Sequence, residues 1–161
     1  MEALRKLVVY FSATGTTRNT AKQLAEATGG DLWEIQPVQP YTEADLAYRN
    51  GGCRVNLEQN GLAPLPEIAN GYPDFSQYDL IFLGSPTWWG TAPKIMIAFL
   101  QGADLRGKQL APFTTSGGSP ASGVARSEKP AAPEADWLPA RRFAISDTQR
   151  DMKQWLEYLE A

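Results

Sequence analysis

The chain has 161 residues, 43% of them hydrophobic and 20% charged, with a formal net charge of −3 and no histidine. These values are typical of a globular protein with a real hydrophobic core, and we expect one domain over residues 1–161. The mild acidity, without any cluster of Lys and Arg, excludes a nucleic-acid-binding protein. The lack of histidine excludes Ser-His-Asp and Cys-His catalytic pairs and makes a zinc site very improbable, so no catalytic or metal-ligating residue is predicted.

The same composition bears on location and partners. No apolar run approaches the roughly 20 residues that a membrane helix needs, and the apolar stretch after Arg5 and Lys6 is too short for a secretion signal. Cys53 is the only cysteine, so no internal disulfide can form. We therefore expect a cytoplasmic protein without nucleic-acid or membrane partners, either a monomer or a homodimer.

Strand-like and helix-like segments alternate along the chain. Residues 4–11 form a continuous apolar run typical of a buried parallel strand, and residues 17–28 have the apolar spacing of a helix that ends at Gly29 and Gly30. Further strands are expected at 31–37, 80–84, 108–115 and 138–145, and further helices at 92–100, 121–129 and 146–159. This alternation predicts an α/β fold, a doubly wound five-stranded parallel sheet of order 2-1-3-4-5 between two helical layers.

Residues 38–77 are the least regular part of the sequence. They are rich in Pro and Gly, and we expect only a short helix at 44–49 within an otherwise loop-like segment. So long a connection in a compact domain is usually functional or covers a site.

A run of small and hydroxylated residues joins the first strand to the first helix: Ser12, Ala13, Thr14, Gly15, Thr16 and Thr17. Free backbone N–H groups and the helix dipole favour an anion at a helix N-terminus, and the hydroxyls add hydrogen-bond donors. Gly15 permits a positive φ where the loop turns. The pattern favours a phosphate site over the alternative, a simple N-terminal cap.

Two further loops follow the third and fourth strands. They consist of Pro86, Thr87, Trp88, Trp89 and Gly90, and of Thr115, Ser116, Gly117, Gly118 and Ser119. In the expected strand order, all three loops border one crevice. The adjacent indoles suit a planar ring, with core packing as the alternative, and the glycine pair lets backbone N–H groups approach a ligand unless it forms a plain turn. A phosphate site beside a flat aromatic wall predicts flavin mononucleotide (FMN).

The three loops resemble those of the flavodoxin-like family, with S-x-T-G-x-T starting at Ser12, P-x-W-W-G at 86–90 and G-G-S at 117–119. The resemblance implies that the hydroxylated residues of the first loop hold the FMN phosphate. It also implies that Trp88 or Trp89 covers the isoalloxazine and that residues 116–119 contact its pyrimidine end. We further expect Gly90 or Gly117 to let a backbone carbonyl turn towards the flavin ring.

Other phosphate-binding folds lack their defining residues here. No G-x-x-x-x-G-K-[ST] motif and no G-x-G-x-x-G motif is present, which excludes a P-loop NTPase and a dinucleotide fold. Cys53 is too far from the first loop for a low-molecular-weight phosphatase.

Three functions stay open. The protein is an electron carrier between larger partners, an enzyme that uses NAD(P)H to reduce a quinone, azo or flavin acceptor, or a phosphate-ligand binding module without redox use. Carriers of this family tend to be strongly acidic, so a charge of −3 weakens the carrier hypothesis. The segment 38–77 favours the enzyme because it can shape a substrate pocket, although no nicotinamide-binding signature is present.

Overall fold

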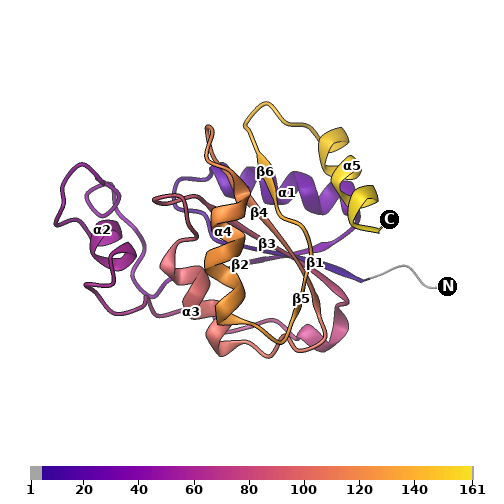
Figure 1. The fold of residues 1–161 in the computed structure, drawn as a ribbon, viewed down its shortest axis with the longest axis horizontal. Coiled ribbons are helices and arrows are strands. Elements are labelled where there is room, and N and C mark those ends of the chain that lie inside the picture. The colour runs from indigo at the N-terminus through magenta and orange to yellow at the C-terminus, as the bar shows by residue number, and fades with distance from the viewer. Residues whose placement is uncertain (1–4, 161) are drawn as a thin grey trace.

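A computed structural model of the protein describes residues 5–160. Within them, one parallel sheet is built from β1 (Lys6–Tyr10), β2 (Asp31–Glu34), β3 (Leu80–Pro86), β4 (Gln109–Thr115), β5 (Asp136–Trp137) and β6 (Arg141–Phe143). The strand order is β2-β1-β3-β4-β5, and β6 also pairs with β4. The predicted order and the parallel, doubly wound arrangement are therefore confirmed (Figure 1).

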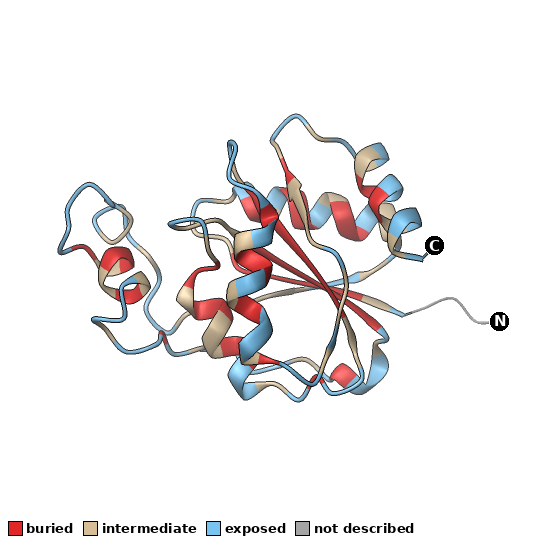
Figure 2. Ribbon diagram, viewed as in Figure 1, coloured by how far each residue is buried: buried red, intermediate tan, exposed pale blue. Residues whose placement is uncertain are grey.

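Helices α1 (Thr16–Thr28) and α5 (Gln149–Glu160) cover one face of this sheet, and α3 (Lys94–Gly102) and α4 (Ala121–Glu128) cover the other. Helix α2 (Arg54–Gln59) lies away from the sheet, and the 3-10 turns are η1 (Phe75–Gln77) and η2 (Lys129–Ala131). Because strand side chains alternate between faces, Val8 and Phe82 pack against α1 and α5, whereas Val9 and Leu83 pack against α3 and α4. Figure 2 shows the resulting band of buried residues along the strands.

The fifth strand differs from the prediction of one strand at 138–145. It is split into β5 and β6, which pair with opposite ends of β4. Pro139 lies in the gap and has no N–H to donate. Pro112 of β4 lies opposite this gap. The Leu110 carbonyl accepts from the Leu138 N–H (2.8 Å), so Leu110 faces the fifth strand. Because residues two apart in a strand face the same neighbour, the nitrogen of Pro112 faces the fifth strand as well. Because the Leu138 N–H faces β4, Pro139 faces away from it, and the ladder donor that is missing at the interruption is that of Pro112.

Other boundaries also differ from those expected. β3 continues through Pro86, which pairs with Thr115, instead of ending at Gly84. β2 stops at Glu34, and residues 44–49 form turns rather than a helix, while the helix of this region is α2. The predicted first strand starts at Leu4, which lies outside the described residues.

Residues 38–67, here called the insertion, leave and rejoin the body through a narrow neck. Pro37 and Ile68 form an isolated antiparallel bridge, the Val38 N–H donates to the Glu67 carbonyl (2.9 Å), and the Ala69 N–H donates to the Gln36 carbonyl (2.7 Å). Figure 1 shows the insertion with α2 standing to one side of the sheet.

None of the helices within residues 5–160 has the length and apolar character required to cross a membrane.

Candidate functional site

A cavity of about 360 Å³ lies at the carboxyl ends of β1, β3 and β4. The residues that line it are Ala13, Thr14, Thr16, Thr17, Leu46, Tyr48, Val55, Pro86, Thr87, Trp88, Trp89 and Thr115. None of these side chains is charged. Hydroxyls from the first loop stand at one part of the wall and aromatic rings at another, so the cavity suits a ligand that is polar at one end and flat and apolar at the other.

The first loop presents donors to this cavity. Gly15 is the N-cap of α1 with φ 98°, which only glycine adopts easily, and its N–H donates to the Ser12 Oγ (3.0 Å). That bond leaves the Ser12 hydroxyl hydrogen free. The N–H groups of Thr16, Thr17 and Arg18 precede the first intrahelical bond, from Asn19 to the Gly15 carbonyl, so they have no partner inside the helix. The loop therefore offers free donors of the kind that an anion needs, and the anion site itself stays a prediction.

Thr17 joins the first loop to β4. It is buried, and its Oγ1 lies 2.8 Å from the Thr115 Oγ1. Only one hydrogen is used in a bond between two hydroxyls, so one of the pair keeps a hydrogen to offer the cavity. The pair therefore fixes the distance between two elements far apart in sequence and still supplies a donor.

The cation beside the first loop is already neutralised. Arg18 pairs with Glu34 through both its Nε and Nη2, and Glu34 also accepts from the Tyr10 hydroxyl (3.1 Å). The Glu34 bond is the main cause that raises the pKa of Arg18. An anion in the cavity thus meets neutral hydroxyls and N–H groups rather than a free guanidinium.

The loop after β3 forms a tight hairpin turn. The N–H groups of Trp88 and Thr91 each donate to the other residue's carbonyl, at 2.9 and 3.0 Å. Both central residues have positive φ, 54° at Trp89 and 75° at Gly90, as in a type I′ turn. Such a backbone costs a bulky residue about 1–3 kcal/mol, and strain of this kind gathers at functional sites.

The two indoles of this turn point to different neighbours. Trp88 packs edge-on against Phe11 and Tyr41, with ring centroids 5.7 and 5.5 Å away, and is half-buried. Trp89 is 56% exposed and meets the Tyr48 ring edge-on at 5.8 Å. Both line the cavity, but only Trp88 packs against the core, so the alternative that both are core residues is wrong, and Trp89 is the freer of the two to face a ligand.

The carbonyl of Gly90 is not available to a ligand in this arrangement. It packs against α4 so closely that a Cβ at Gly123 would lie 2.0 Å from its oxygen. The Ala92 N–H also donates to the Ser127 Oγ of α4 (3.0 Å). In this structure the Gly90 carbonyl thus faces α4, and its turn towards a flavin ring stays a prediction.

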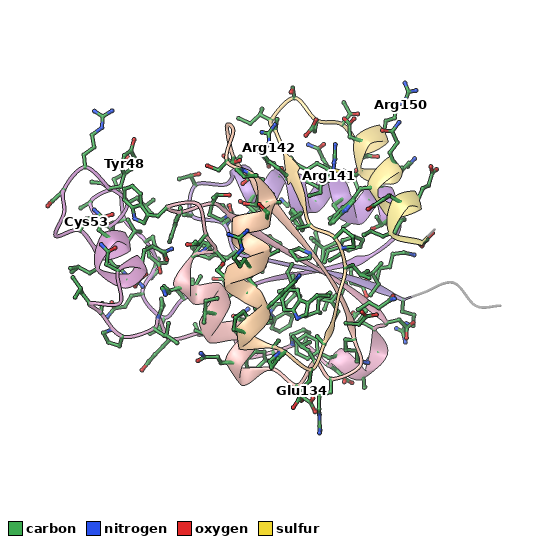
Figure 3. All side chains as sticks on the ribbon, viewed as in Figure 1. Tyr48, Cys53, Glu134, Arg141, Arg142 and Arg150 are labelled. Atoms are coloured by element: carbon green, nitrogen blue, oxygen red, sulfur yellow. The ribbon has the colours of Figure 1, made fainter. Side chains whose placement is uncertain are left out.

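The third loop is tied back through its carbonyls. Arg142 of β6, labelled in Figure 3, donates from Nη1 to the Ser116 carbonyl (2.8 Å), and the Ser116 Oγ donates to the Ser119 carbonyl (2.7 Å). The exposed Gly117 and Gly118 between them have no hydrogen bond in the described structure. Only Thr115 of this loop lines the cavity, so the predicted residues 116–119 stand outside its wall, as do Ser12, Gly15 and Gly90.

The insertion supplies residues that the sequence did not single out. Leu46, Tyr48 and Val55 line the cavity opposite the body of the protein, and Tyr48 is labelled on the insertion in Figure 3. The sequence offered only the length of the segment as a signal, which led to the expectation of a cover but not to these residues. The insertion does lie over this cavity, as a covering segment should.

A polar network holds the insertion together. The Arg54 Nε donates to the Glu58 Oε2 (2.9 Å), its Nη1 donates to the Gln39 carbonyl (2.7 Å), and its guanidinium lies 3.8 Å from the centre of the Tyr41 ring. The Tyr41 hydroxyl donates to the other oxygen of Glu58, and burial together with this carboxylate raises the pKa of Tyr41. Separately, Asn56 of α2 donates to the carbonyls of Tyr48 (2.7 Å) and Asn50 (2.9 Å), which ties the cavity-lining tyrosine to this helix.

Comparison with known proteins places the chain among flavoproteins. The family described as flavodoxin matches residues 5–159. A candidate flavoprotein from Bacteroides eggerthii DSM 20697 is 38% identical, with 99% of each chain covered and a TM-score of 0.93. A second, from Bacteroides uniformis ATCC 8492, is 35% identical over 97% of this chain and 99% of its own, with a TM-score of 0.90.

A more distant structure shares the fold. The flavoprotein from Lactobacillus acidophilus NCFM, solved in complex with FMN, is 22% identical, with 99% of this chain and 100% of its own covered and a TM-score of 0.79. A search of curated proteins found no match.

Proposed function

Because the chain belongs to the flavodoxin family, we propose that it binds FMN in the cavity at the carboxyl ends of β1, β3 and β4 and transfers electrons through it. The observation that carries the proposal is the joining of a donor-rich helix N-terminus and an aromatic wall in one cavity. FMN, when bound, supplies chemistry in one-electron and two-electron steps. The FMN-bound relative from Lactobacillus acidophilus supports the choice of flavin.

In this proposal, the first loop binds the phosphate. The hydroxyls of Ser12, Thr14, Thr16 and Thr17 and the free N–H groups of α1 donate to its oxygens, and the helix dipole adds to their effect. Because Arg18 is paired with Glu34, phosphate affinity comes from oriented neutral donors rather than from a free cation.

The ring end is bound by the turn after β3. Residues 86–90 flank the isoalloxazine, with Trp89 as its cover and Thr87 held in place by its hydroxyl contact with Thr114. Thr115 and residues 116–119 contact the pyrimidine end, and the N–H groups of Gly117 and Gly118 are free to donate to its oxygens. The apolar wall excludes water from the ring and disfavours unpaired charge there.

A titration of the purified protein with FMN and riboflavin tests this. We expect FMN to bind more tightly than riboflavin, because only FMN engages the first loop, and Thr14→Val to reduce that difference. Thr28→Val, at the far end of α1, is the control and should leave the ratio unchanged. A protein without affinity for either flavin would contradict the proposal.

The insertion favours a second candidate, an NAD(P)H-dependent reductase of small acceptors. Its residues Leu46, Tyr48 and Val55 enclose the cavity with apolar surface, which suits a small flat substrate better than the docking of a protein. Oxidation of NADH and NADPH with menadione as acceptor separates the two: rapid turnover favours the enzyme, and no turnover favours the carrier.

We further propose a cytoplasmic location and a redox protein or small acceptor as partner. The buried, free thiol of Cys53 is in keeping with a reducing compartment. Cell fractionation checks the location.

A further inference from the structure

Gln59, the last residue of α2, reaches out of the insertion to the chain between β3 and α3. Its Nε2 donates to the carbonyls of Trp88 (3.3 Å) and Ala92 (3.1 Å) and to the Thr91 hydroxyl (3.2 Å). Its Oε1 accepts from the backbone N–H of Lys94 (2.9 Å). One side chain therefore contacts both ends of the turn that carries Trp89.

A primary amide suits these groups because it offers an oxygen and two N–H hydrogens, which the three acceptors share. The carbonyls of Trp88 and Ala92 can only accept, so the nitrogen of Gln59 must face them, and the Lys94 N–H can only donate, so the oxygen must face it. Lys94 begins α3, and its N–H has no intrahelical partner. Gln59 thus closes the turn on one side and caps a helix on the other.

The turn needs this support because, apart from the edge-on contact of Trp89 with the Tyr48 ring, little holds its tip on the side of the cavity. Trp89 has a positive φ and is more than half exposed, so its burial contributes little to its placement. On the opposite side, α4 contacts the turn through Gly123 and Ser127. The strained turn is therefore held between α4 and Gln59.

We propose that Gln59 is a positioning residue that sets the ring-binding wall of the cavity, so that the insertion controls flavin affinity through the turn at 88–91. This inference rests on the proposed function, since the ring of FMN is what the wall would contact. It adds a role for the insertion beyond covering the cavity: the insertion acts through hydrogen bonds on the element that carries Trp89.

The first test is flavin binding by Gln59→Leu. Losing several hydrogen bonds to the turn should lower the affinity for FMN and for riboflavin by the same factor, about tenfold, because the phosphate loop is untouched. Gln59→Glu keeps the acceptor for Lys94 but sets a carboxylate oxygen against the carbonyls of Trp88 and Ala92, so it should lower both affinities at least as much as Gln59→Leu. Gln101→Leu, at an exposed glutamine of α3, is the matched control and should bind like wild type.

A double-mutant cycle with Trp89→Ala asks whether Gln59 acts through Trp89. If it does, Gln59→Leu with Trp89→Ala should bind flavin no more weakly than Trp89→Ala alone. Additive losses, or an unchanged affinity in Gln59→Leu, would overturn the inference.

Amide exchange of the flavin-free protein tests the tether independently of binding. In Gln59→Leu, exchange at Thr91 and Lys94 should accelerate, while Val55 and Asn60, whose N–H groups bond inside the insertion, should keep their protection. Unchanged exchange at Thr91 and Lys94 would overturn the tether even if no flavin binds. Wild-type protein that binds no flavin, with exchange as expected, would contradict the proposed function and with it the control of flavin affinity, while the tether between Gln59 and the turn would stand.

Discussion

The body and the insertion are held together by different forces. In the body, side chains such as Phe82, Ile95 and Phe99 are fully buried between sheet and helices. In the insertion, the buried side chains include Glu58, which is bound by Arg54, and Asn56, which donates to the Tyr48 carbonyl. Figure 2 shows the contrast between the buried strands and the mostly exposed insertion. The body forms one wall of the cavity and the insertion forms the other. The first wall is held in place by apolar packing and the second mainly by hydrogen bonds.

The two regions also treat a buried carboxylate differently. Glu58 is 5% exposed and is bound by Arg54 and Tyr41. Glu128 occupies the apolar stripe of α4, is fully buried, and has no hydrogen-bond partner on either oxygen. Burial raises the pKa of Glu128 to about 8. The body therefore accommodates this group by keeping it protonated, whereas the insertion uses a charged group as a structural element.

The largest difference between the regions should appear on truncating apolar side chains. Phe82→Ala removes a fully buried ring that packs on Trp155, and should lower the free energy of unfolding by about 3–5 kcal/mol. Leu62→Ala in the insertion removes a side chain that is 75% exposed, and should change it by less than about 0.5 kcal/mol. Urea denaturation measures both, and similar losses would show that the two regions do not differ in this way.

Breaking the polar network should loosen the insertion alone. Glu58→Ala leaves the half-buried Arg54 without its main partner, and should cost the insertion about 2–3 kcal/mol of local stability. Hydrogen exchange should accelerate within residues 38–67 and stay unchanged in β1 and β3. Tyr41→Phe, which removes only the hydroxyl bond, is the milder control. Faster exchange in the sheet would mean that insertion and body unfold together.

The unpaired carboxyl of the body should make stability depend on pH. The folded state holds the Glu128 proton up to a pKa of about 8, whereas the unfolded chain releases it near its ordinary value of 4.5, so the free energy of unfolding should fall as pH rises between these values. The slope from this group is at most about 1.4 kcal/mol per pH unit. Glu128→Gln should flatten the curve from pH 5 to pH 8. Parallel curves for variant and wild type would rule out this role.

The smallest effect concerns the contact between α4 and the turn. Alanine favours a helix over glycine by about 1 kcal/mol, but a Cβ at Gly123 would lie 2.0 Å from the Gly90 oxygen. Overpacking of this kind costs about 1–3 kcal/mol, so Gly123→Ala should destabilise the protein by about 1 kcal/mol net. The nearby exposed Ser122→Ala is the control in thermal unfolding. A higher melting temperature for Gly123→Ala would show that the turn at 88–91 shifts to make room for the added Cβ at little cost in free energy.

The parts of the fold that depend on local pattern were predictable. Apolar runs and helical spacing were sufficient for a parallel sheet with helices on both faces, and the order 2-1-3-4-5, chosen as one that suits five such strands, is confirmed. The position of Gly15 between a strand and a helix indicated where the N-terminus of α1 opens onto the cavity edge. The interruption of the fifth strand was signalled by Pro139 and Pro112, but their alignment depends on register between strands, which the sequence alone does not specify.

The insertion was not predictable in the same way. Its structure depends on pairs distant in sequence, such as Arg54 with Tyr41, Tyr48 with Trp89 and Gln59 with Lys94. Its only helix has six residues, and polar side chains rather than an apolar stripe hold it. Periodicity therefore gave no indication of α2, and the wrong helix at 44–49 was expected in its place.

The neck at Pro37 and Ile68 has a consequence for how such proteins diversify. The insertion begins and ends at neighbouring points of the body. Its length and sequence can therefore change while β2 and β3 keep their register with β1. One side of the cavity is thereby open to evolutionary change, whereas the other is bound to the packing of the sheet. Related proteins could therefore keep the ligand-binding loops of the body and change which molecules reach the cavity by changing the insertion alone.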